Sequence, residues 1–351
     1  MRVTRGKKKL CLSLIIPTLI GLFNVFLVLY PKEVIYAACE GVGLWYSQVL
    51  PSLLPFMIGI NILNGLGFAC FLGALFSPLM RPLFNLPGAG GFVLLSGMTS
   101  GYPMGAKMNA QLRAEGRFTK NEAQRLMGFC NNAGPLFIIG VAGTGLFGNV
   151  NAGYCLWASH ILAAITVGLI LRKTPEQKNT LTDSALQALR PRGPNRLVTP
   201  LRRAFIDYRH FRANNNCDFG YVLSESVKNA MDSITLIGGF IILFCVVIRV
   251  FFILGIISAS RSGASETLIN GLLAGGLEVT NGVKILSAGG MSRAPLAAAA
   301  AVISFGGFSI HAQTMYFLRK TDIKTGPYLA AKALNAALAA GYCLFLYPLF
   351  L

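Results

Sequence analysis

Apolar residues run along this chain in stretches long enough to cross a membrane, separated by short basic or polar segments. The first stretch, residues 10–30, covers the hydrocarbon core of a bilayer if it is helical, because an α-helix rises about 1.5 Å per residue. Two later stretches, 92–112 and 263–289, carry interruptions and are expected to form re-entrant hairpins. Further spanning helices are expected at 45–66, 126–147, 154–171, 233–257, 295–317 and 328–347.

Small and polar residues interrupt the apolar pattern twice in the first half, with TSGYP at 99–103 and NNAGP at 131–135. Proline removes a backbone donor and glycine lets the chain reverse, so we expect open backbone at both places. Open backbone at membrane depth is tolerated where protein buries it or where it lines a cavity. Transporters use such breaks to aim half-helix ends at a ligand or ion, so the interruptions predict a binding site.

The second half repeats this plan, with EVTNG at 278–282 inside a hairpin and GGFSIH at 306–311 inside a span. The triplet at 99–101 parallels that at 280–282. By the charge count the first hairpin enters from the inside and the second from the outside, which predicts an inverted repeat. The expected parts are a basic segment with the first helix (1–30), a first repeat (44–171), a basic cytoplasmic linker (172–225) and a second repeat (226–351).

Four segments carry a family resemblance: SGYPMGAK at 100–107, FCNNAGPLFIIG at 129–140, GGLEVTNGVKIL at 275–286 and SFGGFSIHAQ at 304–313. With them the chain resembles the sporulation integral membrane protein YlbJ family, part of the wider nucleoside-recognition Gate group, over nearly all of 45–342 apart from 172–221. The resemblance implies an all-α polytopic membrane protein similar to the core of concentrative nucleoside transporters. In that architecture two re-entrant hairpins and two broken helices meet at a midplane substrate site.

Composition agrees with a membrane protein, since 54% of the 351 residues are hydrophobic and 13% are charged. The net charge of +18 is more typical of loops retained on the cytoplasmic side than of nucleic-acid binding, because no aromatic-interleaved recognition motif accompanies it. The basic linker is expected to contact anionic lipid. The eight cysteines lack Cys-x-x-Cys or zinc spacing, so we expect no metal and no cofactor.

The basic residues at 1–9 place the N-terminus inside. A lipoprotein signal ending at Ala37-Ala38-Cys39 is the alternative, but the apolar run is too long and Tyr36 does not fit. Residues 68–84 either cross the membrane or lie along its interface. Only the interfacial arrangement keeps the basic clusters at 107–125 and 172–212 inside, with 113–125 as a cytoplasmic loop. The linker, rich in Pro, Asn and Arg, is expected to be flexible.

The candidate substrate-binding residues lie at the interruptions, where amides and hydroxyls can bind a solute or cap the open backbone. Lys107 follows the tip of the first hairpin and is expected at the cytoplasmic entrance of the site. The full set is Thr99, Ser100, Gly101, Lys107, Asn131, Asn132, Glu278, Thr280, Asn281, Ser309, His311 and Gln313.

Ionisable residues in the apolar stretches leave alternatives open. A charge such as Glu278 costs about 2.5–3.5 kcal/mol at the bilayer centre, so it pairs with Lys284, exchanges a proton to couple transport, or is wetted in a shallow hairpin. His311 titrates near neutral pH or bonds a freed carbonyl. Arg249 faces the cavity or reaches the outer interface. His160, on an ordinary span, is expected to be structural.

The resemblance implies a role in spore formation, moving dipicolinate from the mother cell across the outer forespore membrane. As a small aromatic dianion, dipicolinate suits half-helix N-termini and Lys107 or Arg249. A nucleoside or nucleobase carrier is the alternative within the class, although SGYPMGAK lacks the acid-bearing pattern of the concentrative nucleoside transporters. A scaffold without a solute path is a third possibility. We expect no enzyme, because neither Gly-x-Ser-x-Gly nor His-Glu-x-x-His is present; assembly as a homo-oligomer is left open.

Overall fold

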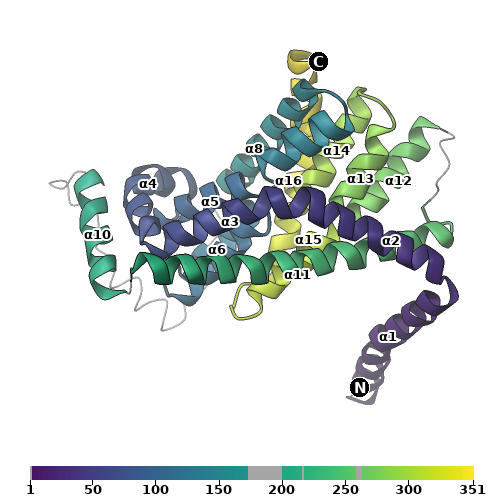
Figure 1. The fold of residues 1–351 in the computed structure, drawn as a ribbon, viewed down its shortest axis with the longest axis horizontal. Helices are drawn as coiled ribbons and strands as arrows, with labels where there is room; N and C mark the ends of the chain where they lie inside the picture. Colours follow the sequence, from purple (N-terminus) through teal and green to yellow (C-terminus); the bar gives the residue numbers. More distant parts are fainter. Residues whose placement is uncertain (1, 173–199, 216, 258–262) are drawn as a thin grey trace.

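The computed structural model describes residues 2–172, 200–215, 217–257 and 263–351, and within these ranges the secondary structure is helical with no strand. Figure 1 shows the helices as one assembly from which the N-terminal helix α1 (Arg2–Leu29) projects. At Tyr30 the chain turns by 103° into α2 (Pro31–Leu44). The first predicted span, 10–30, lies in α1 except for its last residue, Tyr30.

Helix α2 continues through a π-helical turn, η1 (Trp45–Val49), into α3 (Leu50–Gly65), so one long helix runs from Pro31 to Gly65. The predicted start of this helix at residue 45 is therefore wrong. Proline is favoured in the first helical turn, where its missing N–H has no partner to lose, and Pro31 begins the helix instead.

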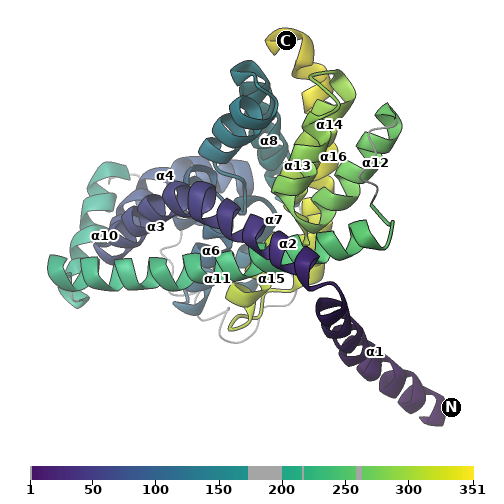
Figure 2. The ribbon, with the colours of Figure 1, turned by 45° about the vertical axis from the view of Figure 1, so that its right-hand side comes forward.

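The long helix α2–η1–α3 packs against α11 (Phe219–Ile253), and the two run in opposite directions (Figures 1 and 2). The Trp45 indole Nε1 donates to the Ile234 carbonyl at 2.9 Å, and Arg249 forms an ion pair with Glu33 at the far end of the pair. Asp218 accepts from the Tyr221 N–H and caps α11, which explains why this helix begins well before the predicted residue 233.

Helix α4 (Phe68–Phe84) packs against both α5 (Ala89–Ser100) and α10 (Pro200–Asn214). The flexible linker expected over 172–225 is wrong for residues 200–214, which are helical. The cause is aromatic packing, since the ring of Phe205 lies edge-on to Phe71 at 5.4 Å between centroids. Residues 219–225 of the expected linker are helical too, as the start of α11, and 173–199 and 216 lie outside the described residues.

The first hairpin and the broken helix that follows it are formed at the predicted positions. The hairpin consists of α5 (Ala89–Ser100) and α6 (Met104–Ala114), and the broken helix of α7 (Lys120–Cys130) and the π-helical η2 (Leu136–Leu146), followed by α8 (Val150–Leu171). The expected loop 113–125 is too long, because Thr119 and Glu122 form a capping box that starts α7. Arg125 is consequently buried, and its guanidinium donates to the Asn85 carbonyl at 2.7 Å.

The second hairpin consists of α12 (Ala264–Leu277) and α13 (Val279–Ser287), followed by α14 (Arg293–Phe305), α15 (Gly307–Leu318) and α16 (Thr325–Phe350). The predicted interruptions, 278–282 and 306–311, are too long. In the structure only Glu278 and Gly306 of these ranges are non-helical, and the residues that follow each of them are helical. Glu278 caps α13 with its own carboxylate, and Gly306 takes a φ of 98° that favours glycine. The triplets at 99–101 and 280–282 are not equivalent, because one ends the first arm and the other begins the second.

By length and composition, four helical segments of the described chain can cross a membrane: Val150–Leu171, Phe219–Ile253, Arg293–Leu318 and Thr325–Phe350. The bent pair of α1 and α2 raises the number to five if it forms one span. This is fewer than the spans predicted, because the apolar helices at Leu53–Gly65 and Leu136–Leu146 are shorter than a span. The chain is an all-helical polytopic membrane protein.

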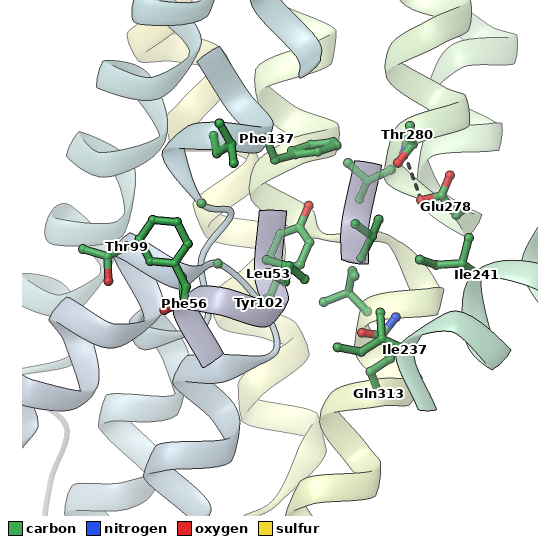
Figure 3. A pocket seen from close by; sticks show the side chains of 17 residues that line it. Leu53, Phe56, Thr99, Tyr102, Phe137, Ile237, Ile241, Glu278, Thr280 and Gln313 are labelled. Carbon is green, nitrogen blue, oxygen red and sulfur yellow. Dashed lines mark hydrogen bonds between the residues drawn. The ribbon is translucent and has the colours of Figure 1, made fainter. Parts of the chain in front are cut away.

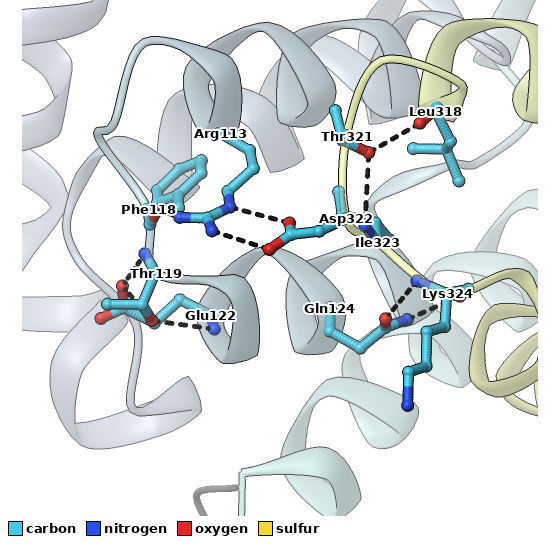
Figure 4. Close-up of polar contacts among 10 residues, drawn as sticks. All are labelled: Arg113, Phe118, Thr119, Glu122, Gln124, Leu318, Thr321, Asp322, Ile323 and Lys324. Carbon is cyan, nitrogen blue, oxygen red and sulfur yellow. Dashed lines mark hydrogen bonds and ion pairs between the residues drawn. The ribbon is translucent and has the colours of Figure 1, made fainter. Parts of the chain in front are cut away.

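Two polar loops that the sequence places on one side of the membrane contact each other (Figure 4). Arg113, at the end of α6, binds both carboxylate oxygens of Asp322 at 3.0 and 2.9 Å. Gln124 on α7 exchanges two hydrogen bonds with the backbone of Lys324, of 2.9 and 2.6 Å. The loop between α15 and α16 is therefore fixed to the α6–α7 region.

Candidate functional site

The first hairpin encloses the end of α7. A methyl group added at Gly97 on α5 or at Gly105 on α6 would lie 1.9 Å from the Cys130 carbonyl oxygen in either case. At the tip, a methyl group on Gly101 would lie 2.8 Å from the Gly134 nitrogen. Only glycine permits such close backbone approach, so the hairpin and the helix break form one packed unit.

The second hairpin packs on the second break in a similar way. A methyl group on Gly307 would lie 2.9 Å from the Gly275 carbonyl oxygen, and one on Gly282 would lie 2.2 Å from the Gly275 Cα. The two arms of this hairpin therefore touch through glycines, and its first arm touches the start of α15. Each hairpin is thus joined to the broken helix that follows it in sequence.

Both hairpin tips and the two long helices meet around a cavity of about 70 Å³, which we call the central cavity (Figure 3). Its walls come from hairpin one, the first break, the second hairpin, α15, the η1–α3 region and α11. The lining residues are Val49, Leu53, Phe56, Thr99, Ser100, Gly101, Tyr102, Gly134, Leu136, Phe137, Ile237, Ile241, Glu278, Val279, Thr280, Ile310 and Gln313. Six of the twelve predicted site residues belong to this set.

Three residues of the lining set carry a buried polar atom with no partner in the described protein: Ser100 Oγ, Tyr102 OH and Gln313 Oε1. A buried polar group left without a hydrogen bond costs about 1–3 kcal/mol. The surrounding walls are aromatic and aliphatic, with Phe56 and Phe137 on the side of the first hairpin (Figure 3). This combination of apolar walls and a few unpaired polar groups is typical of a small-molecule site.

Glu278 is the charged residue of the lining set, and it is 5% exposed. Its carboxylate accepts from the backbone N–H groups of Thr280 at 3.0 Å and Asn281 at 2.8 Å. The predicted pairing with Lys284 does not form: Lys284 is exposed, and the carboxylate turns instead to the positive end of α13. Glu278 therefore both caps the second tip and faces the cavity.

Asn131 and Asn132 are fully buried at the first break but do not line the central cavity. The Asn131 amide donates to Thr314 Oγ1 at 3.0 Å and to the Tyr328 hydroxyl at 3.2 Å, behind the cavity wall. Asn132 donates to the Phe129 carbonyl at 2.8 Å, which caps the open end of α7. The Ala133 N–H donates to Nε2 of His160, consistent with a structural role for this histidine.

His311, Ser309 and Asn281 are not in the lining set, and each of them contacts other protein groups. His311 Nδ1 lies 3.0 Å from the Tyr328 hydroxyl, Ser309 accepts from the Gln313 amide, and Asn281 lies against Cys245. Arg249 does not face the cavity, because it pairs with Glu33 near the end of α11.

Lys107 lines a second, polar cleft of about 800 Å³ between α3, α6, α10 and α11. Its ammonium donates to the Ser233 hydroxyl at 2.9 Å and to the Asn229 carbonyl at 3.3 Å. Asn229 lines this polar cleft, and Ile237, about two helical turns further along α11, lines the central cavity. Lys107 is therefore bound to α11 between the two spaces.

Sequence reasoning missed Tyr102 and Lys332. Tyr102 lies inside the TSGYP interruption, and its position there was a signal that could have identified it. Lys332 is a lone charge in the apolar stretch of α16, which is itself the usual signal of a functional residue in a membrane helix. Within the described residues, no group of three or more His, Cys, Asp and Glu side chains is placed to hold a metal ion.

Comparison with known proteins gives two matches. Residues 46–170, which contain the first hairpin and the first break, match the Gate family, described as nucleoside recognition. The sequence is 34% identical to the sporulation integral membrane protein YlbJ of Bacillus subtilis (strain 168), over 97% of this chain and 85% of that protein. No solved structure matches the chain.

Proposed function

The chain belongs to the family of the sporulation integral membrane protein YlbJ, and from this we propose that it is a transporter that carries a small aromatic solute through the central cavity. The observation that carries the proposal is the set of unpaired polar atoms, Ser100 Oγ, Tyr102 OH and Gln313 Oε1, between apolar walls. A ring with polar substituents satisfies both features, since it stacks on the walls and accepts or donates at its edge. We propose no enzymatic activity.

Our first candidate solute is dipicolinate, carried across the outer forespore membrane from the mother cell. Two hydroxyl donors, those of Ser100 and Tyr102, can bind one of its carboxylates. The lining set holds Glu278 and no cation, so a second negative charge in the cavity is disfavoured. We therefore propose that dipicolinate crosses with its charge reduced by bound protons.

A nucleoside is the second candidate, and a specific observation favours it. Glu278 accepts hydrogen bonds and Gln313 offers an unpaired amide oxygen, so both can bind the hydroxyl or amino groups of an uncharged solute. The match of residues 46–170 to a nucleoside-recognition family agrees with this assignment. The polar cleft beside Lys107 offers either solute an entrance from the end of the molecule that bears the α6–α7 region.

Flux into proteoliposomes tests the proposal, with labelled dipicolinate and labelled uridine in separate arms. Tyr102→Phe removes one hydroxyl and Gln313→Leu one amide, without changing the apolar walls. Loss of one hydrogen bond of about 1.4 kcal/mol lowers uptake at limiting solute about tenfold. Ser224→Ala, on an exposed face of α11, is the matched control and should transport like the unaltered protein.

The two arms separate the candidates. Uptake of dipicolinate that rises as the external pH falls supports the first candidate, and uptake of uridine alone supports the second. Absence of both fluxes, or equal uptake by the Tyr102→Phe, Gln313→Leu and control variants, would contradict transport through this cavity.

A further inference from the structure

Lys332, on α16, is a buried positive charge without an acidic partner. Its side chain is 1% exposed, and its ammonium donates to the Asn131 carbonyl oxygen at 3.0 Å. Within the described chain no carboxylate lies within ion-pair distance of it. A buried lysine in a membrane helix is costly, which makes it a candidate functional residue.

The carbonyl that Lys332 binds belongs to the first residue after α7. The end of a helix carries free carbonyl groups and about half a negative charge. Here Asn131 leaves the helical conformation, with φ −95° and ψ 89°, so no further turn covers this end. In transporters with broken helices, such open C-terminal ends hold the sodium ion or proton.

The first break and the helix face of Lys332 carry further amide oxygens. The side-chain oxygens of Asn131 and Asn132, and both polar side-chain atoms of Asn335, are buried without a partner. Asn335 follows Lys332 by three positions on α16 and so shares its helix face. Carbonyl and amide oxygens are the ligands that a small hard cation prefers.

The other groups near this end are uncharged acceptors or donors. Tyr328 and Thr314 bind the Asn131 amide, and His311 binds the Tyr328 hydroxyl. Lys332 does not line the central cavity, so its charge serves the helix break and not direct contact with the solute.

We propose that the Lys332 ammonium is a resident cation: it holds the oxygen-lined position at the open end of α7 that a sodium ion would otherwise fill, and removing the side chain creates a sodium site. The consequence for the proposed transporter is a first helix break that stays closed without bound sodium. The inference deepens the proposed function, but its main test uses no solute, so the two can fail separately.

The test compares melting temperatures of purified variants in sodium chloride and in choline chloride at equal ionic strength. The unaltered protein should melt at the same temperature in both salts. Lys332→Ala removes the ammonium and leaves space among the oxygens, so it should melt lower in choline chloride. Its melting temperature should then rise with the logarithm of the sodium concentration, as expected for a ligand that binds the folded state.

Two variants serve as controls. Lys332→Met fills the space of the lysine stem without a charge and should melt equally in both salts. Lys284→Ala removes an exposed lysine of the second hairpin and should behave like the unaltered protein.

Three results would overturn the proposal. One is sodium-dependent melting of the unaltered protein, and another is equal melting of Lys332→Ala in the two salts. If Lys332→Ala is lost during extraction in choline chloride, the purification is repeated in sodium chloride throughout. Recovery of folded protein in sodium chloride alone supports the site. Loss of the variant in both salts is the third result that contradicts the proposal. Flux of the unaltered protein, where either solute is carried, should be equal with and without a sodium gradient.

Discussion

Replacing Gly105 with alanine tests whether the first hairpin is built around the end of α7. The added methyl group would lie 1.9 Å from the Cys130 carbonyl oxygen and 2.7 Å from its carbon. Side-chain carbons essentially never approach other heavy atoms closer than 3.0 Å, and the atoms met here belong to the backbone. The hairpin and α7 must therefore move apart by about 1 Å, because no flexible side chain can yield.

The change in unfolding free energy caused by Gly105→Ala follows from two opposing effects. Overpacking of this kind costs about 1–3 kcal/mol, and a rigid backbone neighbour places it toward the upper end. Alanine in a helix interior gains up to about 1 kcal/mol over glycine. The net loss of unfolding free energy is about 2 kcal/mol, which corresponds to several degrees in melting temperature.

The matched control is Gly276→Ala on α12, where an added methyl group meets nothing within 4 Å. This change should be neutral or stabilise by up to about 1 kcal/mol. Melting of the purified protein, followed by circular dichroism, compares the two variants, and Gly97→Ala should lose as much as Gly105→Ala because it meets the same carbonyl. If Gly105→Ala melts at or above Gly276→Ala, the packing described for the first hairpin is incorrect.

Two further predictions concern contacts outside the central cavity. Trp45→Phe removes the indole N–H bound to the Ile234 carbonyl and should cost about 1 kcal/mol of unfolding free energy, read from thermal melting by circular dichroism; an unchanged melting temperature would refute a contribution of this bond. Arg113 holds the pKa of the Asp322 carboxyl below its usual value. The ion pair therefore stabilises the loop fully above the pKa of an unfolded aspartate, about 3.9, and this stabilisation is lost as the pH falls through the lower pKa of the folded state. With 12% and 38% of the two side chains exposed, the pair contributes at most about 1 kcal/mol, and Asp322→Asn should remove the acid-dependent rise in amide exchange of residues 319–324; a rise that persists in this variant would refute the assignment.

The first half of the chain was predicted closely because proline and glycine fix where helices stop. Pro103 and Pro135 cannot donate to a helical turn, and the structure ends α5 at Ser100, within the first interruption, and α7 at Cys130, just before the second. The second half has no proline at its interruptions, so their lengths could not be predicted. Glu278 and Gly306 each end one helix and begin the next, a compact solution that depends on a capping side chain and a positive φ.

The lengths of the two long helices, α2–η1–α3 and α11, were underestimated because the residues through which they pack lie far apart in the sequence. Trp45 and Tyr46 are typical of a membrane interface, yet Trp45 binds the Ile234 carbonyl within the packed pair. Sequence also cannot give the rotation of a broken helix about its axis. That rotation decides that Gln313 lines the central cavity while His311 and Asn131 face the network behind it.

The placement of the two buried charges says what kind of solute the central cavity favours. Lys332 lies at the negative end of α7, and Glu278 at the positive end of α13. Both side chains belong to the second half of the chain: Lys332 offsets an open helix end of the first half, and Glu278 offsets one of its own half. The half-helix N-terminus that the sequence offered to an anion is already occupied by a carboxylate, and the expected cations, Lys107 and Arg249, are bound to Ser233 and Glu33. For the proposed transporter, we infer that selection in the central cavity depends on ring stacking and on hydrogen bonds to Ser100, Tyr102 and Gln313, and that it favours a solute with little net charge.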